Sequence, residues 1–158
     1  MVWFYAEVQK QNRSWVETSK LAKEVLREFS PGEGALYVTN IPDNFNGAYF
    51  LRNGLGEALS VLNHHDFTER LHMISYQTIT SVNDKANAEM VSSSVCRVAF
   101  AQPEGKIPQA EKIFTVVPDS SRYSYSEVSD TSFVVTVKAL PAKSSFYFYS
   151  AGRLNEVH

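Results

Sequence analysis

The chain contains one cysteine and no long apolar run, and both scarcities narrow the class of protein. Because Cys96 has no second thiol to pair with, an intrachain disulfide is excluded. A reducing compartment and a bacterial extracytoplasmic location both stay open. No stretch approaches the roughly 20 apolar residues that span a bilayer, and the first residues lack the basic start and apolar region of a signal peptide. The given residues therefore predict a soluble domain.

Clustered charge of one sign is also missing. The 15 basic and 17 acidic residues leave a net charge of -2, and the lysines and arginines form no cluster. A nucleic-acid binder carries a basic patch, so we expect no nucleic acid partner. Hydrophobic residues make up 44% and charged residues 20% of the 158 residues, which is ordinary globular usage. We predict a single soluble domain over residues 1–158 that folds without disulfides or metals.

Complete catalytic motifs are absent as well. The chain has neither a Gly-x-Ser-x-Gly elbow nor a Walker loop, and residues 53–56 lack the third glycine of a dinucleotide fingerprint. His64, His65 and Asp66 have no second ligand cluster, so we expect them in an exposed turn. Cys96 lies on an alternating apolar segment, which indicates a buried thiol. The sequence thus offers no catalytic residue, no metal site and no cofactor.

What is present is a helical first part followed by strands. Apolar spacing predicts helices over residues 14–29 and 47–62, with a Ser14–Glu17 capping box before the first and a buried strand at 35–41 between them. From residue 71 the period changes to two. Strands are expected at 71–82, 90–101, 112–117, 122–128, 131–139 and 145–150. The predicted class is α+β, with two or three helices packed on one face of a mixed, mainly antiparallel sheet. The side chains expected inside are Trp15, Leu21, Val25, Leu36, Val38, Leu55 and Leu59.

The opening residues allow two interpretations. Val2-Trp3-Phe4-Tyr5-Ala6 is an aromatic cluster without polar alternation, directly before a polar run. Trp and Tyr gather at membrane interfaces, so residues 1–8 fit the end of a membrane helix that has been cut short. The alternative is a first strand or a packing tail.

The segment from residue 40 to 52 is the candidate binding site. A buried strand ends there, short polar side chains follow, and a helix is expected to begin at once. Helix N-termini offer free N–H groups to anionic or polyhydroxy ligands. The candidate ligand-binding residues are Asn40, Asp43, Asn44, Asn46 and Arg52. The alternative is that they only close a turn and cap the helix, in which case Asp43→Ala costs about 1 kcal/mol of stability.

Tyrosines at two-residue spacing form a second candidate surface. Tyr123 and Tyr125 lie on one predicted strand, and Tyr147 and Tyr149 lie on another. Aromatic faces on a sheet can stack on sugar rings, which requires at least two rings to be exposed side by side. Packing between strands is the competing explanation.

The first part of the chain resembles a known family. Trp15 on a leading helix, residues 36–43 (Leu-Tyr-Val-Thr-Asn-Ile-Pro-Asp) and residues 47–55 (Gly-Ala-Tyr-Phe-Leu-Arg-Asn-Gly-Leu) are similar to the soluble C-terminal domain of bacterial multi-spanning membrane proteins. Those proteins are related to lipid-linked-sugar (dolichyl-phosphate-mannose mannosyltransferase-like) glycosyltransferases. The likeness implies membrane helices before residue 1 and a place on the outer face of the membrane. The family's catalytic acidic residues lie between membrane helices, so no catalytic residue is transferred to this chain.

These observations leave three functions to compare. The first is a non-catalytic extracytoplasmic accessory domain that binds or positions an acceptor or a partner, with the membrane part of its own parent chain, a glycan or a lipid-linked sugar as partners. The second is a free-standing soluble enzyme with a site at residues 40–47, favoured by a perturbed Asp43 in a deep pocket. The third is a carbohydrate-binding module using the tyrosine strands.

Overall fold

The computed structural model describes residues 2–45, 48–52, 54–103, 105, 112–118 and 120–158. Within them the chain forms two helices and a series of short strands. The elements are α1 (Val2–Glu28), β1 (Leu36–Val38), β2 (Ile41–Phe45), β3 (Ala48–Tyr49), α2 (Leu55–Asn63), β4 (Leu71–Met73), β5 (Ser75–Ile79), β6 (Ala86–Ser92), β7 (Val95–Phe100), β8 (Phe114–Val116), β9 (Tyr123–Ser126), β10 (Ser132–Val137), β11 (Ser145–Ser150) and β12 (Arg153–Glu156).

The strands form three four-stranded sheets. Sheet A has the order β12-β11-β1-β4, sheet B the order β3-β2-β5-β8 and sheet C the order β6-β7-β10-β9. In sheet A, β1 runs parallel to both β11 and β4, and in sheet B, β2 runs parallel to β5. The β1–β2 and β4–β5 segments each pass from sheet A to sheet B within one or two residues, so the two sheets adjoin.

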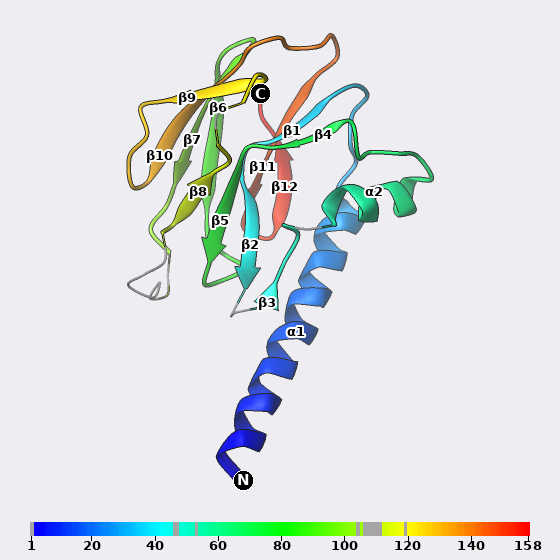
Figure 1. The fold of residues 1–158 in the computed structure, drawn as a ribbon, viewed down its shortest axis with the longest axis vertical. Coiled ribbons are helices and arrows are strands. Elements are labelled where there is room, and N and C mark those ends of the chain that lie inside the picture. The colour runs from blue at the N-terminus through cyan, green and yellow to red at the C-terminus, as the bar shows by residue number, and fades with distance from the viewer. Residues whose placement is uncertain (1, 46–47, 53, 104, 106–111, 119) are drawn as a thin grey trace.

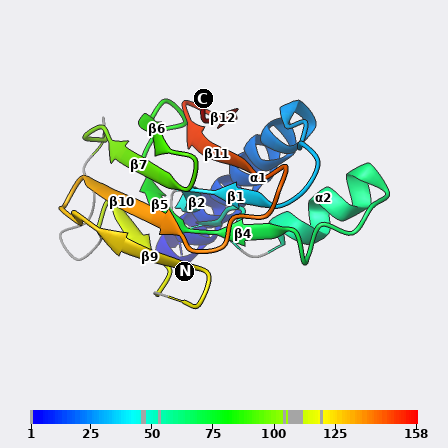
Figure 2. The same ribbon diagram turned by 90° about the horizontal axis from the view of Figure 1, so that it is seen from above.

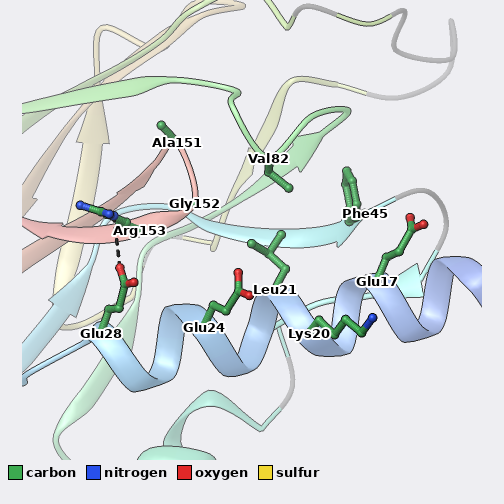
Figure 3. A pocket seen from close by; sticks show the side chains of 10 residues that line it. All are labelled: Glu17, Lys20, Leu21, Glu24, Glu28, Phe45, Val82, Ala151, Gly152 and Arg153. Carbon is green, nitrogen blue, oxygen red and sulfur yellow. Dashed lines mark ion pairs between the residues drawn. The ribbon is translucent and has the colours of Figure 1, made fainter.

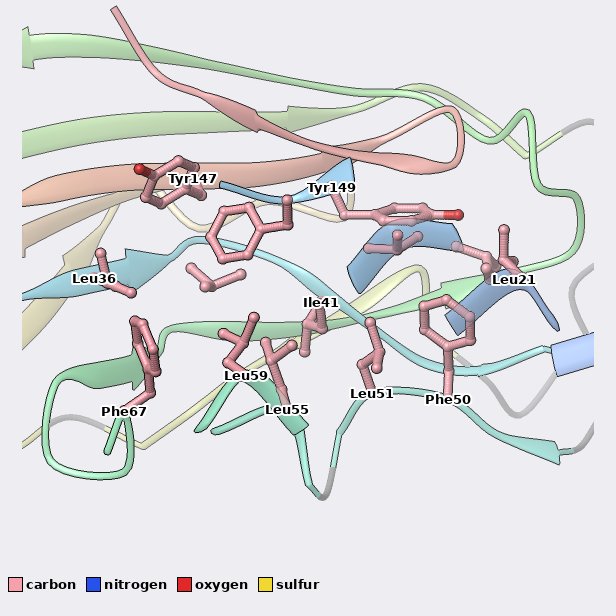
Figure 4. Packing of buried hydrophobic residues seen from close by; sticks show 14 residues of the cluster. Leu21, Leu36, Ile41, Phe50, Leu51, Leu55, Leu59, Phe67, Tyr147 and Tyr149 are labelled. Atoms are coloured by element: carbon pink, nitrogen blue, oxygen red, sulfur yellow. The ribbon is translucent and has the colours of Figure 1, made fainter. Parts of the chain in front are cut away.

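Both helices cover one face of these adjoining sheets (Figures 1 and 2). Leu36 and Val38 of β1 point to that face because alternate strand residues share a side. They pack with Val25 of α1, with Leu55 and Leu59 of α2, and with the rest of a buried cluster (Figure 4). The intervening Tyr37 points the other way, into a second cluster with the apolar side chains of sheet C. The molecule therefore has a helical layer, a central pair of sheets and sheet C.

The α+β class with mixed sheets is confirmed. The sequence predicts one sheet, whereas the described residues form three. Of the expected strands, residues 71–82 divide into β4 and β5, and residues 90–101 contain the end of β6 and all of β7. β12 lies outside the predicted ranges. Sheet C alone is purely antiparallel. The burial prediction holds for Leu21, Val25, Leu36, Val38, Leu55 and Leu59.

The first helix differs from its prediction in start and in burial. It begins at Val2, and the Ser14 hydroxyl donates to the Lys10 carbonyl inside it (3.2 Å), so Ser14 is not a cap. Gln, Lys and Arg are good helix formers, which explains why the polar run continues the helix. Trp15 is 52% exposed, contrary to expectation, because the body of the domain begins only at Thr18. A first strand at the N-terminus is likewise wrong, since residues 2–8 are helical.

The second helix also begins later than predicted. Residues 48–49 form β3, and α2 starts at Leu55 after Gly54, whose φ of 100° lies in the left-handed region that favours glycine. Apolar residues at helical spacing before Gly54 are thus in a hairpin and a bend. Among the described residues, neither helix has the length together with the apolar character that crossing a membrane requires.

Candidate functional site

Asn40, the first candidate residue, makes buried hydrogen bonds inside the protein. Its side chain is fully buried between β1 and β2. Its Nδ2 donates to Gln77 Oε1 (2.7 Å) and to the Tyr149 carbonyl (2.9 Å), while its Oδ1 accepts from the Tyr149 amide (3.1 Å). Thr39 Oγ1 lies 3.3 Å from the same oxygen. The amide is therefore used to join sheets A and B.

Asp43 and Arg52 meet at the surface. Arg52 Nη1 lies 3.0 and 3.2 Å from the two oxygens of Asp43, and its guanidinium sits 4.8 Å from the centre of the Tyr76 ring. The Asp43 carbonyl accepts the Phe50 amide (2.9 Å), which holds the two ends of the β2–β3 hairpin together. The side chains of Arg52 and Asp43 are 43% and 23% exposed. This places Asp43 in an accessible ion pair, not in the deep pocket that the enzyme interpretation requires.

The other two candidates separate. Asn44 lies half-buried on β2, opposite Tyr49 of β3 and Thr78 of β5. Asn46 lies outside the described residues. Residues 41–45 form a strand and not a loop, so the short polar side chains alternate between faces instead of converging on one ligand. The predicted cluster of five is thus not assembled as such.

Arg52 instead faces the start of α2. A shallow hollow of about 290 Å³ is lined by Arg52, by the first residues of α2 and by side chains of the following strand. Gly54 caps α2 without a side-chain hydrogen bond, so the N–H groups of the first turn have no side-chain acceptor there. Glu57 in the same turn and Asp43 on Arg52 both oppose an anion at this place. The hollow therefore offers the Arg52 guanidinium and a helix N-terminus to an anion, but Asp43 and Glu57 partly neutralise their positive charge.

The tyrosine strands do not form a sugar-binding surface. Tyr123, Tyr147 and Tyr149 are buried, and the Tyr125 hydroxyl donates to the Ile74 carbonyl (2.7 Å). Tyr123 and Tyr125 contact each other edge to face at 5.9 Å. The packing explanation is confirmed, and the exposed pair that the carbohydrate module needs is missing among these four residues.

Two smaller expectations are also decided. His64 and His65 are exposed just after α2, where His64 adopts a left-handed conformation at the helix end. Cys96 is buried in sheet C, and burial raises the pKa of its thiol to about 12. A thiol in that state is a poor nucleophile.

A groove beside α1 is the feature that the sequence did not indicate. It has a volume of about 510 Å³ and lies between α1 and the β11–β12 turn (Figure 3). Leu21, Phe45 and Val82 form an apolar floor. Glu17, Glu24 and Glu28 follow one another along its helical rim. The spacing of these glutamates on one helix face was the available signal, but the opposite wall comes from residues far away in the sequence.

Two polar atoms lie orphaned behind the wall of this groove. Within the described chain, neither Tyr149 Oη nor Asp84 Oδ1 has a hydrogen-bond partner, although both are buried. The other Asp84 oxygen accepts from the Thr80 and Ser81 amides (2.6 and 3.2 Å). Burial raises the pKa of the Tyr149 hydroxyl, the Gly152 N–H beside it lowers the pKa in part without reaching hydrogen-bond geometry, and the charge of Asp84 raises it further. Buried polar groups without partners are rare in folded proteins.

Comparisons with protein-family models, with curated proteins and with solved structures found no match to this chain.

Proposed function

We propose that this chain is a non-catalytic accessory domain of a membrane glycosyltransferase-like protein, placed on the outer face of a bacterial membrane, where it positions an acceptor or a partner. The family resemblance supports the proposal through residues 36–43 and 47–55. In the fold these segments supply β1, most of β2, and β3 with the start of α2.

The observation that carries the proposal is the shape of α1. Its second half packs on the domain through Thr18, Leu21 and Val25, while its first half projects beyond the body as a stalk (Figure 1). A domain held at the end of a membrane helix needs such a connection. The stalk ends at the apolar, aromatic residues of the N-terminus.

The stalk also has an uncharged side. Helical spacing puts Val8, Trp15 and Val16 within one half of its circumference, and these are 37%, 52% and 54% exposed. Lys10 and Glu17 lie on the opposite half. Exposed tryptophan on an uncharged face is typical of contact with an interface or with a neighbouring helix. The membrane part of the parent chain is the partner proposed for this side.

For the ligand, Arg52 is the proposed residue and the hollow at the α2 N-terminus is the proposed place, while Asp43, Asn44 and Asn46 stay predictions from the sequence. An acceptor phosphate would take the Arg52 guanidinium and the free N–H groups of α2.

Cell fractionation tests the proposal. An antiserum against this domain is used on the organism that produces it, with intact and permeabilised cells treated with protease. We expect the antigen in the membrane fraction, on a chain much larger than 17.8 kDa. We also expect the protease to cleave it whenever the protease can reach the outer face of the membrane. Antigen of 17.8 kDa in the soluble fraction, protected until the cells are lysed, would overturn it.

A further inference from the structure

The groove beside α1 combines an acidic rim with an apolar floor. Arg153 Nε lies 3.2 Å from Glu28 Oε2 and closes one end of the rim. Lys20 lies on the rim between Glu17 and Glu24 (Figure 3). No salt bridge joins Glu17 or Glu24 to a basic residue within the described chain. The rim has three glutamates but only two basic residues, so its net charge is negative. Two of the glutamates form no salt bridge within the described chain.

An independent observation lies under the floor. The Tyr149 hydroxyl is directed toward Leu21, which belongs to the floor (Figure 4). The same hydroxyl lies near the Gly152 backbone, and Gly152 forms the opposite wall. The Asp84 carbonyl accepts the Ala151 amide (3.0 Å), which fixes Asp84 behind that wall. Two buried oxygen atoms without a hydrogen-bond partner in the described chain therefore lie behind residues that line a negatively charged groove.

We propose that this groove binds a basic segment of a partner polypeptide, with one lysine ammonium donating to Tyr149 Oη and Asp84 Oδ1. An ammonium offers three N–H donors, so it can donate to the Tyr149 hydroxyl oxygen and to Asp84 Oδ1 at once. Its four-carbon stem fits the floor of Leu21, Phe45 and Val82. Entry requires Val82 to turn aside, and this side chain is already 37% exposed.

The length of the groove favours a polypeptide over a small amine. From Glu17 to Glu28 the helix advances about 16 Å at 1.5 Å per residue. From Glu17 to Glu24 it advances about 10 Å, close to the roughly 9 Å that three residues of a polyproline II segment cover. Residues three apart in such a segment share one face, so one lysine can enter the floor while the next meets a rim carboxylate, whereas a small amine meets only the centre. This site is separate from Asp43 and Arg52, and the inference does not depend on attachment to a membrane.

The experiment is an NMR titration of the isotope-labelled chain, residues 1–158. The probe is a blocked pentapeptide of three alanines with lysines at its first and fourth positions. We expect shifts at Leu21, Val82 and Gly152 with a dissociation constant on the order of 1 mM. The same peptide with both lysines acetylated is the charge control and should give no shifts there. Spermidine is the comparison for a free polyamine.

Matched variants separate the two parts of the site. Glu24→Gln removes a rim charge and should weaken binding about threefold, while Glu7→Gln on the projecting part of α1 should not change it. Tyr149→Phe keeps the buried ring and should weaken binding about tenfold. Val61→Ala, an exposed site on α2, is the control for nonspecific effects on the spectrum.

Each outcome decides the proposal. Shifts confined to the groove that disappear with acetylation and weaken in Glu24→Gln and Tyr149→Phe support it. Equal affinity for spermidine and the peptide would overturn the polypeptide as occupant. Absence of shifts in the groove at saturating peptide, or binding unaffected by Tyr149→Phe, would overturn the ammonium site.

Discussion

At the scale of single residues, two tyrosines of β11 differ in one hydrogen bond. The Tyr147 hydroxyl accepts the Gly32 amide (3.0 Å), whereas the Tyr149 hydroxyl has no partner in the described chain. Tyr147→Phe should lower the free energy of unfolding by about 1 kcal/mol because an amide loses its acceptor. Tyr149→Phe should leave it unchanged or raise it by up to about 1 kcal/mol, because no bond is lost and burial improves. Urea unfolding of both variants beside the wild type measures this, and an equal loss in both would contradict it.

His72 provides a residue-scale test of pH dependence. Burial lowers the pKa of its imidazole from the ordinary 6.5, the charge of Arg122 lowers it further, and Glu69 opposes both. Arg122 Nη1 lies 2.9 Å from Nδ1, so the neutral ring accepts this bond. The folded pKa is below the unfolded one, so the unfolded chain binds the proton more readily and stability falls as pH drops below 6.5.

His72→Gln should flatten that part of the stability curve, because glutamine accepts from Arg122 without titrating. Urea unfolding at a series of pH values between neutral and mildly acidic measures it. His65→Gln, at an exposed histidine after α2, is the comparison variant. A wild-type slope that persists in His72→Gln contradicts the assignment.

The Asp43–Arg52 pair has a small expected effect on stability. Because both side chains reach solvent, the pair should contribute about 0.5 kcal/mol, below the 1 kcal/mol that a capping role of Asp43 predicts. A double-mutant cycle with Asp43→Ala and Arg52→Ala isolates this coupling. A coupling energy above about 2 kcal/mol would show that the pair acts as a buried interaction and not as a surface one.

At the scale of elements, α2 packs on the domain through one side and exposes the other to solvent. Leu59 is fully buried in the helix-side cluster, while Leu62 is 56% exposed. Leu59→Ala should therefore cost about 3 kcal/mol through lost burial and a cavity. Leu62→Ala removes the same atoms and should change stability by less than about 0.5 kcal/mol. The urea midpoints of the two variants measure these changes. Similar losses of stability in both would contradict the assignment of Leu59 to the buried side of α2.

The helices also show how far periodicity predicts structure. The three- and four-residue spacing located the buried stripe of α1 correctly at Leu21 and Val25. It also included Trp15, because a sequence pattern does not show where the sheet beneath a helix ends. The turn-rich segment around Pro42 was predicted as a loop, yet it forms a strand whose pairing with β5 shifts register after Pro42. Proline and asparagine are rare in strands, so tertiary pairing outweighs local preference there.

At the scale of the whole molecule, the pairing of distant strands was not predictable. β1 lies between β11 and β4, and its parallel pairing with β11 sets Leu36 opposite Ser145. Local sequence carries no signal for such a contact. The groove beside α1 follows from the same long-range arrangement, because its walls come from α1, β2 and the β11–β12 turn. Among the candidate site residues, the structure brings Asp43 and Arg52 into contact, and these two lie near each other in the sequence.

Asn40 connects the central sheets and should govern the stability of the whole domain. Asn40→Ala leaves the Gln77 side chain and both backbone groups of Tyr149 without their buried partner, so we expect a loss of about 3 kcal/mol. Asn44→Ala, a half-buried neighbour on β2, is the control and should cost less than about 1 kcal/mol.

Because β1 and β2 are consecutive, damage at Asn40 reaches sheets A and B together, and the Asn40→Ala variant should still unfold in one transition. Circular dichroism in the far ultraviolet and methyl NMR intensities, followed through the same urea series, should give coincident midpoints. Midpoints that separate would mean that the helix-side cluster and the sheet C cluster unfold independently, and that Asn40 stabilises only one of them.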